Sequence, residues 1–253
     1  MELFDLSGKV AVITGSSRGI GRAIAERMAE HGAKVVISSR NLDACEEVAA
    51  AINAKLPGAA IAVAASISRK AELETLVAEA RKAFGKIDVL VCNAASNPHY
   101  GPMLGAGDDA FRKTMDNNIL SNLWLVQMVA PEMIERRDGA IIIVSSIGGL
   151  RGSVEIGVYN VSKAADFQLC RNLAQELGPH NIRVNCIAPG LVKTDFARAL
   201  WEGPMGPKRI EDTPLRRLGD PDDIAGAAVF LAGRAGAWVT GQTIVVDGGV
   251  TSG

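Results

Sequence analysis

The chain has 253 residues, 48% of them hydrophobic and 22% charged, with a formal net charge of −1. This length suits one α/β domain, and the balanced charge lacks the basic patches of proteins that bind nucleic acids or anionic membranes. The sequence contains no run of about 18 apolar residues, so no membrane span is predicted. The opening residues MELFDLSGKV do not resemble a signal peptide. We therefore expect a cytoplasmic protein.

Strand and helix patterns alternate through the first third of the chain. Continuous apolar runs predict strands over 9–14, 34–38, 60–64 and 88–92. Apolar residues at helical spacing predict helices over 19–30, 42–55 and 70–84, the last of them ended by Gly85.

The alternation continues to the C-terminus. A long helical pattern over 111–136, interrupted by Pro131, precedes strands over 140–145, 182–188 and 243–246 and helices over 157–177 and 222–232. Strands that are apolar throughout indicate burial on both faces, as in a parallel sheet covered by helices. We predict one domain over 1–253 that contains a doubly wound parallel sheet of about seven strands, with a substrate-covering loop at about 191–215.

Cysteines and histidines give little support for a metal site. The four cysteines form no C-x-x-C pair, and only three histidines are present. We expect no metal, and reduced thiols at Cys45, Cys92, Cys170 and Cys186.

The turn from Thr14 to Gly21 (TGSSRGIG) joins the first predicted strand to the first helix. Gly15 permits the turn, while Gly19 and Gly21 remove side chains that would block a pyrophosphate or the packing of helix on strand. The helix N-terminus offers free N–H groups to phosphates. The spacing predicts a dinucleotide site, although it differs from the usual G-x-G-x-x-G.

Two other interpretations of this turn are open. It fits an ordinary glycine-rich connection, and it also fits the G-x-S-x-G pattern in which Ser17 would be a hydrolase nucleophile. A hydrolase needs a histidine at the same edge of the sheet. His180 is the last histidine and precedes a predicted strand, which places it at the wrong edge.

The end of the second predicted strand bears on cofactor choice. NAD-selecting domains usually carry an acidic residue there to bind the ribose 2′-hydroxyl, but this chain has Ser39 and Arg40. Arg40, with Arg18 from the phosphate turn, offers donors for a 2′-phosphate. The pair predicts NADP(H), although each arginine alone fits a solvated surface charge.

Tyr159 and Lys163 begin the helix after the fifth predicted strand and share one face. A nearby ammonium would favour the phenolate and make Tyr159 a usable acid or base. Ser146, at the end of that strand, is placed to hold a carbonyl oxygen. A tyrosine packed on its helix beside a solvated lysine is the alternative.

Taken together, these motifs closely resemble the short-chain dehydrogenase/reductase family over essentially the full length. Asn93-Ala94-Ala95, Asn118 and Pro189-Gly190 match further family segments in the same order. The resemblance implies a Rossmann-type fold in which Ser146 orients the carbonyl and Tyr159 is the acid or base. It also implies that Lys163 binds the nicotinamide ribose and lowers the tyrosine pKa, and that Asn118 holds a relay water.

The resemblance and the turn together imply a set of residues around NADP(H). On the adenosine side, Ala95 and Ser66 stand where the family usually has glycine and aspartate. The expected contacts come from the turn, the strand ends and the catalytic helix: Gly15, Ser17, Arg18, Gly19, Ile20, Gly21, Ser39, Arg40, Ser66, Ile67, Asn93, Ala94, Tyr159, Lys163, Pro189, Gly190, Val192 and Thr194.

Several stretches look most like the NADPH-dependent carbonyl and retinal reductase branch. Apolar side chains in 191–215, with others at Tyr100, Met103, Leu104, Leu150 and Val154, predict a mostly apolar carbonyl substrate. One alternative is a 3-oxoacyl-[acyl-carrier-protein] reductase, for which Arg198, Lys208, Arg216 and Arg217 would supply a basic surface. Another is a catalytically silent NADP-binding regulatory protein. The resemblance further implies a homotetramer.

Overall fold

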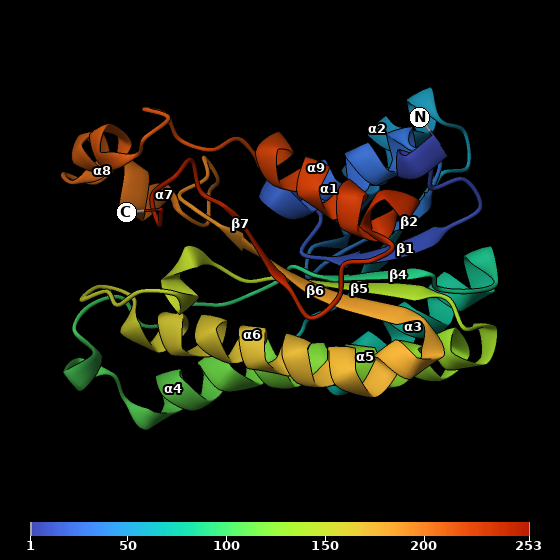
Figure 1. Cartoon of the computed structure of the whole chain (residues 1–253), viewed down its shortest axis with the longest axis horizontal. Helices are drawn as coiled ribbons and strands as arrows, with labels where there is room; N and C mark the ends of the chain where they lie inside the picture. The colour runs from blue at the N-terminus through green and yellow to red at the C-terminus, as the bar shows by residue number, and fades with distance from the viewer. Residues whose placement is uncertain (1, 253) are drawn as a thin grey trace.

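Strands of the computed structural model, which describes residues 2–252, form a single parallel sheet in the order β3-β2-β1-β4-β5-β6-β7 (Figure 1). This confirms the predicted doubly wound, Rossmann-type α/β fold with seven strands in the described residues. The strands are β1 (Val10–Thr14), β2 (Lys34–Ser39), β3 (Ala60–Ala64), β4 (Val89–Cys92), β5 (Gly139–Val144), β6 (Ile182–Pro189) and β7 (Thr243–Val246).

The central strands are buried along their whole length. Every residue of β1, β4 and β5 is buried, which is why these segments read as continuous apolar runs. The chain order reverses between β1 and β4, since β1 pairs with β2 on one side and β4 on the other. In such sheets, ligands bind beyond the carboxyl ends of the strands at this point of reversal.

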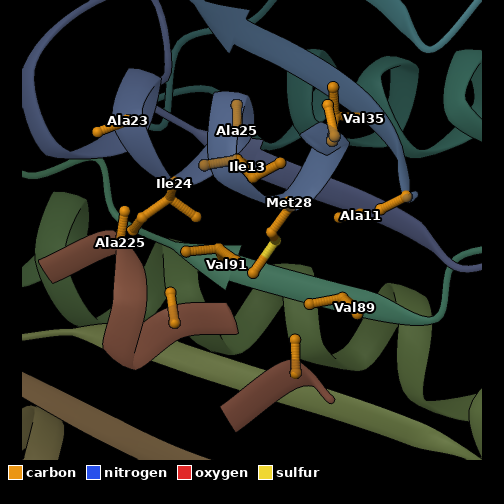
Figure 2. Packing of buried hydrophobic residues seen from close by; sticks show 14 of the residues in the cluster. Ala11, Ile13, Ala23, Ile24, Ala25, Met28, Val35, Val89, Val91 and Ala225 are labelled. Carbon is orange, nitrogen blue, oxygen red and sulfur yellow. The ribbon is translucent and has the colours of Figure 1, made fainter. Parts of the chain in front are cut away.

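Helices cover both faces of the sheet (Figure 1). One face carries α1 (Gly19–Glu30), α2 (Leu42–Lys55) and α9 (Pro221–Ala232), and the other carries α3 (Lys70–Phe84), α5 (Ser121–Arg136) and α6 (Gly157–Leu177). Figure 2 shows the first layer, where Ile24 and Met28 of α1 and Ala225 of α9 pack with Ile13 and Val91 of the sheet. Two apolar cores therefore hold the strand ends in fixed positions.

The helical region before β5 differs from its prediction. The chain forms α4 (Asp108–Met115), a π-helical turn (Asp116–Leu120) and then α5, which runs through Pro131 without a break. The predicted interruption at Pro131 is wrong. Val129 and Met133 are buried on either side of the proline, and their packing outweighs the hydrogen bond that Pro131 cannot donate.

The segment over 191–215 is less irregular than its composition indicates, because it contains α7 (Arg198–Trp201) and α8 (Gly206–Asp212). Both lie together beyond one end of the sheet, close to the C-terminus (Figure 1). Short turns complete the chain: η1 (Glu2–Phe4), η2 (Met103–Gly105), η4 (Ile147–Gly149), η5 (Gly178–His180) and η6 (Arg234–Gly236). Over residues 2–252, none of the helices has the length and apolarity to traverse a bilayer.

Candidate active site

The turn between β1 and α1 is built from glycines that have no room for a side chain. Gly15 and Gly19 have φ of +66° and +56°, a region that favours glycine. A Cβ on Gly21 would lie 2.4 Å from the Gly15 carbonyl oxygen and 2.5 Å from Asn93 Nδ2. The turn therefore lets α1 approach the end of β1 closely, as the sequence predicts.

Asn93 fastens this turn to the end of β4. Its Nδ2 donates to the carbonyl oxygens of Thr14 at 2.9 Å and Gly15 at 3.1 Å. Thr14 Oγ1 in turn accepts from the backbone N–H groups of Asn93 at 3.0 Å and Ala94 at 3.1 Å. The structure thus brings the predicted residues of the turn and of the 93–94 segment together.

The N-terminus of α1 is free to hold an anion. Arg18 is the N-cap residue and its side chain makes no capping hydrogen bond, so the first N–H groups of Gly19, Ile20 and Gly21 point out of the helix end. Together with the glycine cradle, this helix end fits the pyrophosphate of a dinucleotide. Ser17 lies in the same turn, beside Arg18.

The far side of the cradle would face the adenosine half of such a ligand. Arg40 follows β2 and is exposed, while Ser39 Oγ is hydrogen-bonded to the backbone of Asn41. Arg18 is 70% exposed and lies 3.5 Å from Asp195, in the 191–215 segment. Ser66 and Ile67 follow β3, and Glu72 Oε2 accepts from the Ser66 N–H at 2.7 Å.

Tyr159 lies in the first turn of α6 with only 8% of its surface exposed. Burial raises the pKa of Tyr159; Lys163 opposes that rise, Asp166 adds to it, and a hydrogen bond from Ser146 opposes it. Ser146 Oγ also accepts from the Gly148 N–H at 3.0 Å. The three predicted residues Ser146, Tyr159 and Lys163 thus meet at the end of β5.

Lys163 is buried directly beneath Tyr159. Its Nζ lies 5.6 Å from the centroid of the Tyr159 ring and donates to the Val144 carbonyl oxygen at 2.9 Å and to Asp166 Oδ2 at 3.0 Å. Burial acts to lower the pKa of Lys163, but Asp166 and Tyr159 outweigh it, so the pKa is raised. Lys163 is therefore a protonated cation, unlike the solvated lysine of the alternative interpretation.

The π-helical turn at 116–120 positions Asn118. Asn118 Oδ1 accepts from the Ser96 N–H at 2.8 Å, and Nδ2 donates to the Ser96 carbonyl at 3.0 Å and to Ser162 Oγ at 2.9 Å. Ser162 Oγ donates to the Tyr159 carbonyl oxygen at 2.7 Å. A continuous set of hydrogen bonds therefore joins Asn118 to the first turn of α6, and π turns are frequent at functional sites.

The chain leaves β6 through Pro189 and Gly190 and then runs past the glycine turn. A Cβ on Gly190 would lie 2.7 Å from the Cα of Asp247, so only glycine allows this approach to the end of β7. Val192 is buried and forms a bridge with Gly219. Thr194 lies against the phosphate turn, because a Cβ on Gly19 would stand 3.2 Å from its Cγ2.

Exposed apolar side chains occur in the segments 100–104, 150–154 and 191–215, and we call this set the apolar rim. The Phe196 ring lies 5.9 Å from the Tyr159 ring. More than 40% of the surface of each remaining member of this rim is exposed, although single exposed apolar residues are common on proteins. These residues are Tyr100, Met103, Leu104, Leu150, Val154 and Met205.

The hydrolase interpretation fails on geometry. Ser17 follows the carboxyl end of β1, whereas His180 lies in η5 directly before the start of β6. Parallel strands place these two positions at opposite edges of the sheet, so His180 cannot act on Ser17. Within residues 2–252, no group of three His, Cys, Asp or Glu side chains is arranged to hold a metal, and all four cysteines are free and buried.

Comparison with known proteins is consistent with this geometry. The family model described as enoyl-(acyl carrier protein) reductase matches residues 15–251. Human dehydrogenase/reductase SDR family member 4 is 43% identical over 251 residues, which cover 98% of this chain and 89% of that protein. The chain belongs to the short-chain dehydrogenase/reductase family.

Two solved structures of the family carry nicotinamide cofactors. A 7α-hydroxysteroid dehydrogenase complexed with NADH and 7-oxo glycochenodeoxycholic acid has a TM-score of 0.93 and 40% identity, over 98% of this chain and 96% of that one. A gluconate 5-dehydrogenase from Burkholderia cenocepacia J2315, in complex with NADP and tartrate, has a TM-score of 0.93 and 33% identity, over 100% and 98%. As a member of this family, the chain is an oxidoreductase that acts on CH–OH groups and binds a nicotinamide cofactor.

Several residues that hold the site of this short-chain dehydrogenase/reductase in place carry no motif in the sequence. Ser16 Oγ donates to the Ile13 carbonyl at 2.7 Å and accepts from the Ser38 N–H at 2.9 Å, which ties the glycine turn to β2. Asp166 and Asn122 form the polar group behind Lys163. The spacing of Asp166, three residues after Lys163 on the same helical face, was the available signal.

Proposed function

We propose that this chain is an NADP(H)-dependent reductase that converts a ketone or aldehyde to an alcohol. The observation that carries the proposal is the grouping of buried Tyr159 and Lys163 with half-buried Ser146 at the carboxyl end of β5, with Asn118 linked to it through Ser162. This grouping lies at the edge of the sheet where the glycine turn would hold a dinucleotide.

The side chains divide the reaction between them. Bound reduced nicotinamide supplies a hydride to the carbonyl carbon. Ser146 donates a hydrogen bond to the carbonyl oxygen, and Tyr159 gives its phenolic proton to that oxygen as the alcohol forms. Tyr159 is left as a phenolate, which the Lys163 ammonium stabilises until a proton returns from water, with Asn118 placed to hold the relay water.

Three segments would hold the cofactor. The glycine turn and the N-terminus of α1 would bind the pyrophosphate, and Lys163 would bind the nicotinamide ribose. The segment after β6 borders the nicotinamide, and the ends of β2 and β3 border the adenosine. The proposed contacts in these segments are Pro189, Gly190, Val192 and Thr194 after β6, Ser39 and Arg40 after β2, and Ser66 and Ile67 after β3.

The preference for NADP over NAD rests on Arg40. It is exposed at the end of β2, where an acidic residue would repel a 2′-phosphate, and it is free to form charge-assisted hydrogen bonds. Arg18 is a second donor, since its exposed pair with Asp195 at 3.5 Å is weak and easily exchanged.

The apolar rim supports an apolar carbonyl substrate, covered by the 191–215 segment. The alternative of a carrier-protein substrate needs free basic side chains at the opening. Arg198 lies 2.5 Å from Asp195, Lys208 lies 3.6 Å from Asp212, and both terminal nitrogens of Arg217 donate to Asp223. These exposed pairs are weak, so the preference for a small-molecule substrate rests on the apolar side chains of the rim.

Two further observations bear on the other expectations. A catalytically silent protein has no need for a buried lysine under a buried tyrosine, because burial of both groups is costly. Exposed apolar residues on α4, α6 and the edge strand β7 support assembly into a homotetramer: Phe111, Val161 and Val245.

Cofactor consumption by the purified protein tests the proposal. NADPH and NADH are compared with an aromatic α-dicarbonyl, retinal and a 3-oxoacyl thioester. NADPH-dependent turnover of the dicarbonyl or retinal is expected, with little turnover of the thioester. Preference for the thioester would favour the carrier-protein reductase, and the absence of turnover with every substrate would contradict the proposal.

A further inference from the structure

The carboxylate of Asp166 is fully buried next to Lys163. Asp166 has no exposed side-chain surface, and its Oδ2 is 3.0 Å from Lys163 Nζ, whose side chain is 3% exposed. Asp166 Oδ1 accepts from Asn122 Nδ2 of α5 at 3.2 Å. Asp166 is therefore held from two helices in an orientation that directs one oxygen at the lysine.

Packing does not explain an acid at this position. α6 buries its inner face against an apolar cluster that includes its neighbours Phe167 and Cys170. An apolar side chain at 166 would fit this surface, whereas a buried carboxylate is costly unless it is paired. The only cation at hydrogen-bond distance from Asp166 among the described residues is Lys163. The effect of Asp166 is therefore exerted through its ion pair with Lys163.

The Lys163–Asp166 pair sets how strongly a phenolate at Tyr159 is stabilised. A lone ammonium 5.6 Å from the ring centroid would stabilise the phenolate strongly in this buried site. Asp166 places an opposite charge on the far side of that ammonium, so Lys163 stabilises the phenolate less than a lone ammonium would. The two charges act on the pKa of Tyr159 in opposite directions, with Lys163 lowering it and Asp166 raising it.

We propose that Asp166 is a positioning residue that offsets the positive charge of Lys163 and thereby weakens the stabilisation of the Tyr159 phenolate, which favours proton donation to a carbonyl over proton removal from an alcohol. The statement about direction rests on the proposed function. The protonation of Tyr159 does not, because it can be measured without turnover.

The other titratable groups that face Asp166 are thiols. Cys92 lies at the end of β4, Cys186 in β6 and Cys170 in α6. Burial raises the pKa of Cys92, and a hydrogen bond with Cys170 together with burial raises that of Cys186, so both stay uncharged at neutral pH. Cys170 Sγ donates a hydrogen bond to the Val184 carbonyl oxygen at 3.3 Å. Burial is the largest cause of the raised pKa of Tyr159, and Lys163 and Asp166 are the charged groups that modify it.

The chain makes a direct titration possible, because Tyr100 and Tyr159 are its two tyrosines. In a Tyr100→Phe parent, the near-ultraviolet absorbance of tyrosinate reports Tyr159 alone. Asp166→Asn keeps an oxygen that can accept from Lys163 but removes the charge. We expect the tyrosinate midpoint to fall by about one pH unit. An unchanged or higher midpoint would overturn the proposal.

Two controls separate this effect from general changes in charge or packing. Glu176→Gln removes a carboxylate from the exposed face of the same helix and should leave the midpoint in place. Lys163→Met combined with Asp166→Leu replaces the whole pair with apolar side chains, which buried pairs often tolerate. If Asp166 offsets the charge of Lys163, the midpoint of this double variant stays near that of the parent. A clear rise would mean that Lys163 acts as an uncompensated cation.

The pH profile of turnover gives the functional consequence. With Asp166→Asn, the rate of alcohol oxidation should begin to rise at a lower pH than in the wild type, following the Tyr159 midpoint. A parent that turns over none of the substrates would contradict the proposed function, while the titration would still decide the role of Asp166.

Discussion

Arg209 of α8 lies 2.5 Å from Glu155, which stands two residues before the start of α6. Each side chain is about one third exposed, and Arg209 Nη1 also donates to the Leu200 carbonyl oxygen at 2.6 Å. The Glu155 carbonyl oxygen accepts from the Gly101 N–H at 2.7 Å. The segments that contain Gly101, Glu155 and Arg209 are therefore joined at Glu155.

Removing the charge of Glu155 should loosen the 191–215 segment. For Glu155→Gln we expect faster limited proteolysis within 191–215 and a KM for the carbonyl substrate raised about fivefold, with a smaller change in kcat. A partly exposed ion pair contributes about 1 kcal/mol, which corresponds to that factor. Asp108→Asn is the matched control, since its pair with Arg112 is largely exposed. Equal effects from both variants would contradict a specific role for Glu155.

The glycine turn should reject even one methyl group. Gly21→Ala puts a Cβ within 2.5 Å of Gly15 and Asn93 atoms, so α1 must shift away from β1. We expect the free energy of unfolding to fall by about 1–3 kcal/mol and cofactor binding, measured by calorimetry, to be lost. Gly226→Ala in α9 meets nothing within 4 Å and should stabilise the protein by up to about 1 kcal/mol. Unchanged cofactor affinity in Gly21→Ala would argue against the cradle.

The fold was largely predictable because its signals are local. Buried parallel strands give unbroken apolar runs, and each predicted strand agrees with an observed one to within one residue at either end. The π-helical turn was not predictable, because hydrophobic spacing does not distinguish a single wide turn from the α-helix around it. The prediction of a break at Pro131 was wrong because the packing of the long helix α5 stabilises it more than the one lost hydrogen bond destabilises it.

The site shows the same limit. The spacing of Tyr159 and Lys163 marked them in the sequence, and the glycines marked the turn. Asp166 was missed because a single acidic residue on a long helix reads as a solvated charge until its burial is known. The partners of Asn118 were also beyond sequence reasoning, since Ser96 and Ser162 lie 22 and 44 residues away along the chain.

Cofactor preference should reverse with the charge at Arg40. Arg40→Asp removes a donor to the 2′-phosphate and adds a group that can bind a ribose hydroxyl. We expect NADPH affinity to fall about 10- to 100-fold, since a charge-assisted hydrogen bond contributes about 1.5–3 kcal/mol, and NADH affinity to hold or improve. Binding is measured by fluorescence titration. Arg234→Asp makes the same charge change on the exposed surface of η6 and should leave the preference unaltered. A retained NADPH preference in Arg40→Asp would remove that arginine from cofactor selection.

Tyr159→Phe should separate proton transfer from binding. The variant keeps the ring that packs near Phe196 and lacks only the phenolic oxygen, so the fold and the cofactor site should be preserved. We expect kcat for carbonyl reduction to fall by about 10²–10⁴-fold, the usual contribution of a positioned acid, while the Kd for NADPH changes little. Tyr100→Phe removes the other phenol, on the exposed rim, and should retain turnover. The Tyr159→Phe rate is best measured in a single turnover with NADPH, where slow product release cannot hide a lost chemical step. A rate close to that of the wild type would assign the proton to another group, and a parallel loss of NADPH affinity would instead mean that the phenol helps to bind the cofactor.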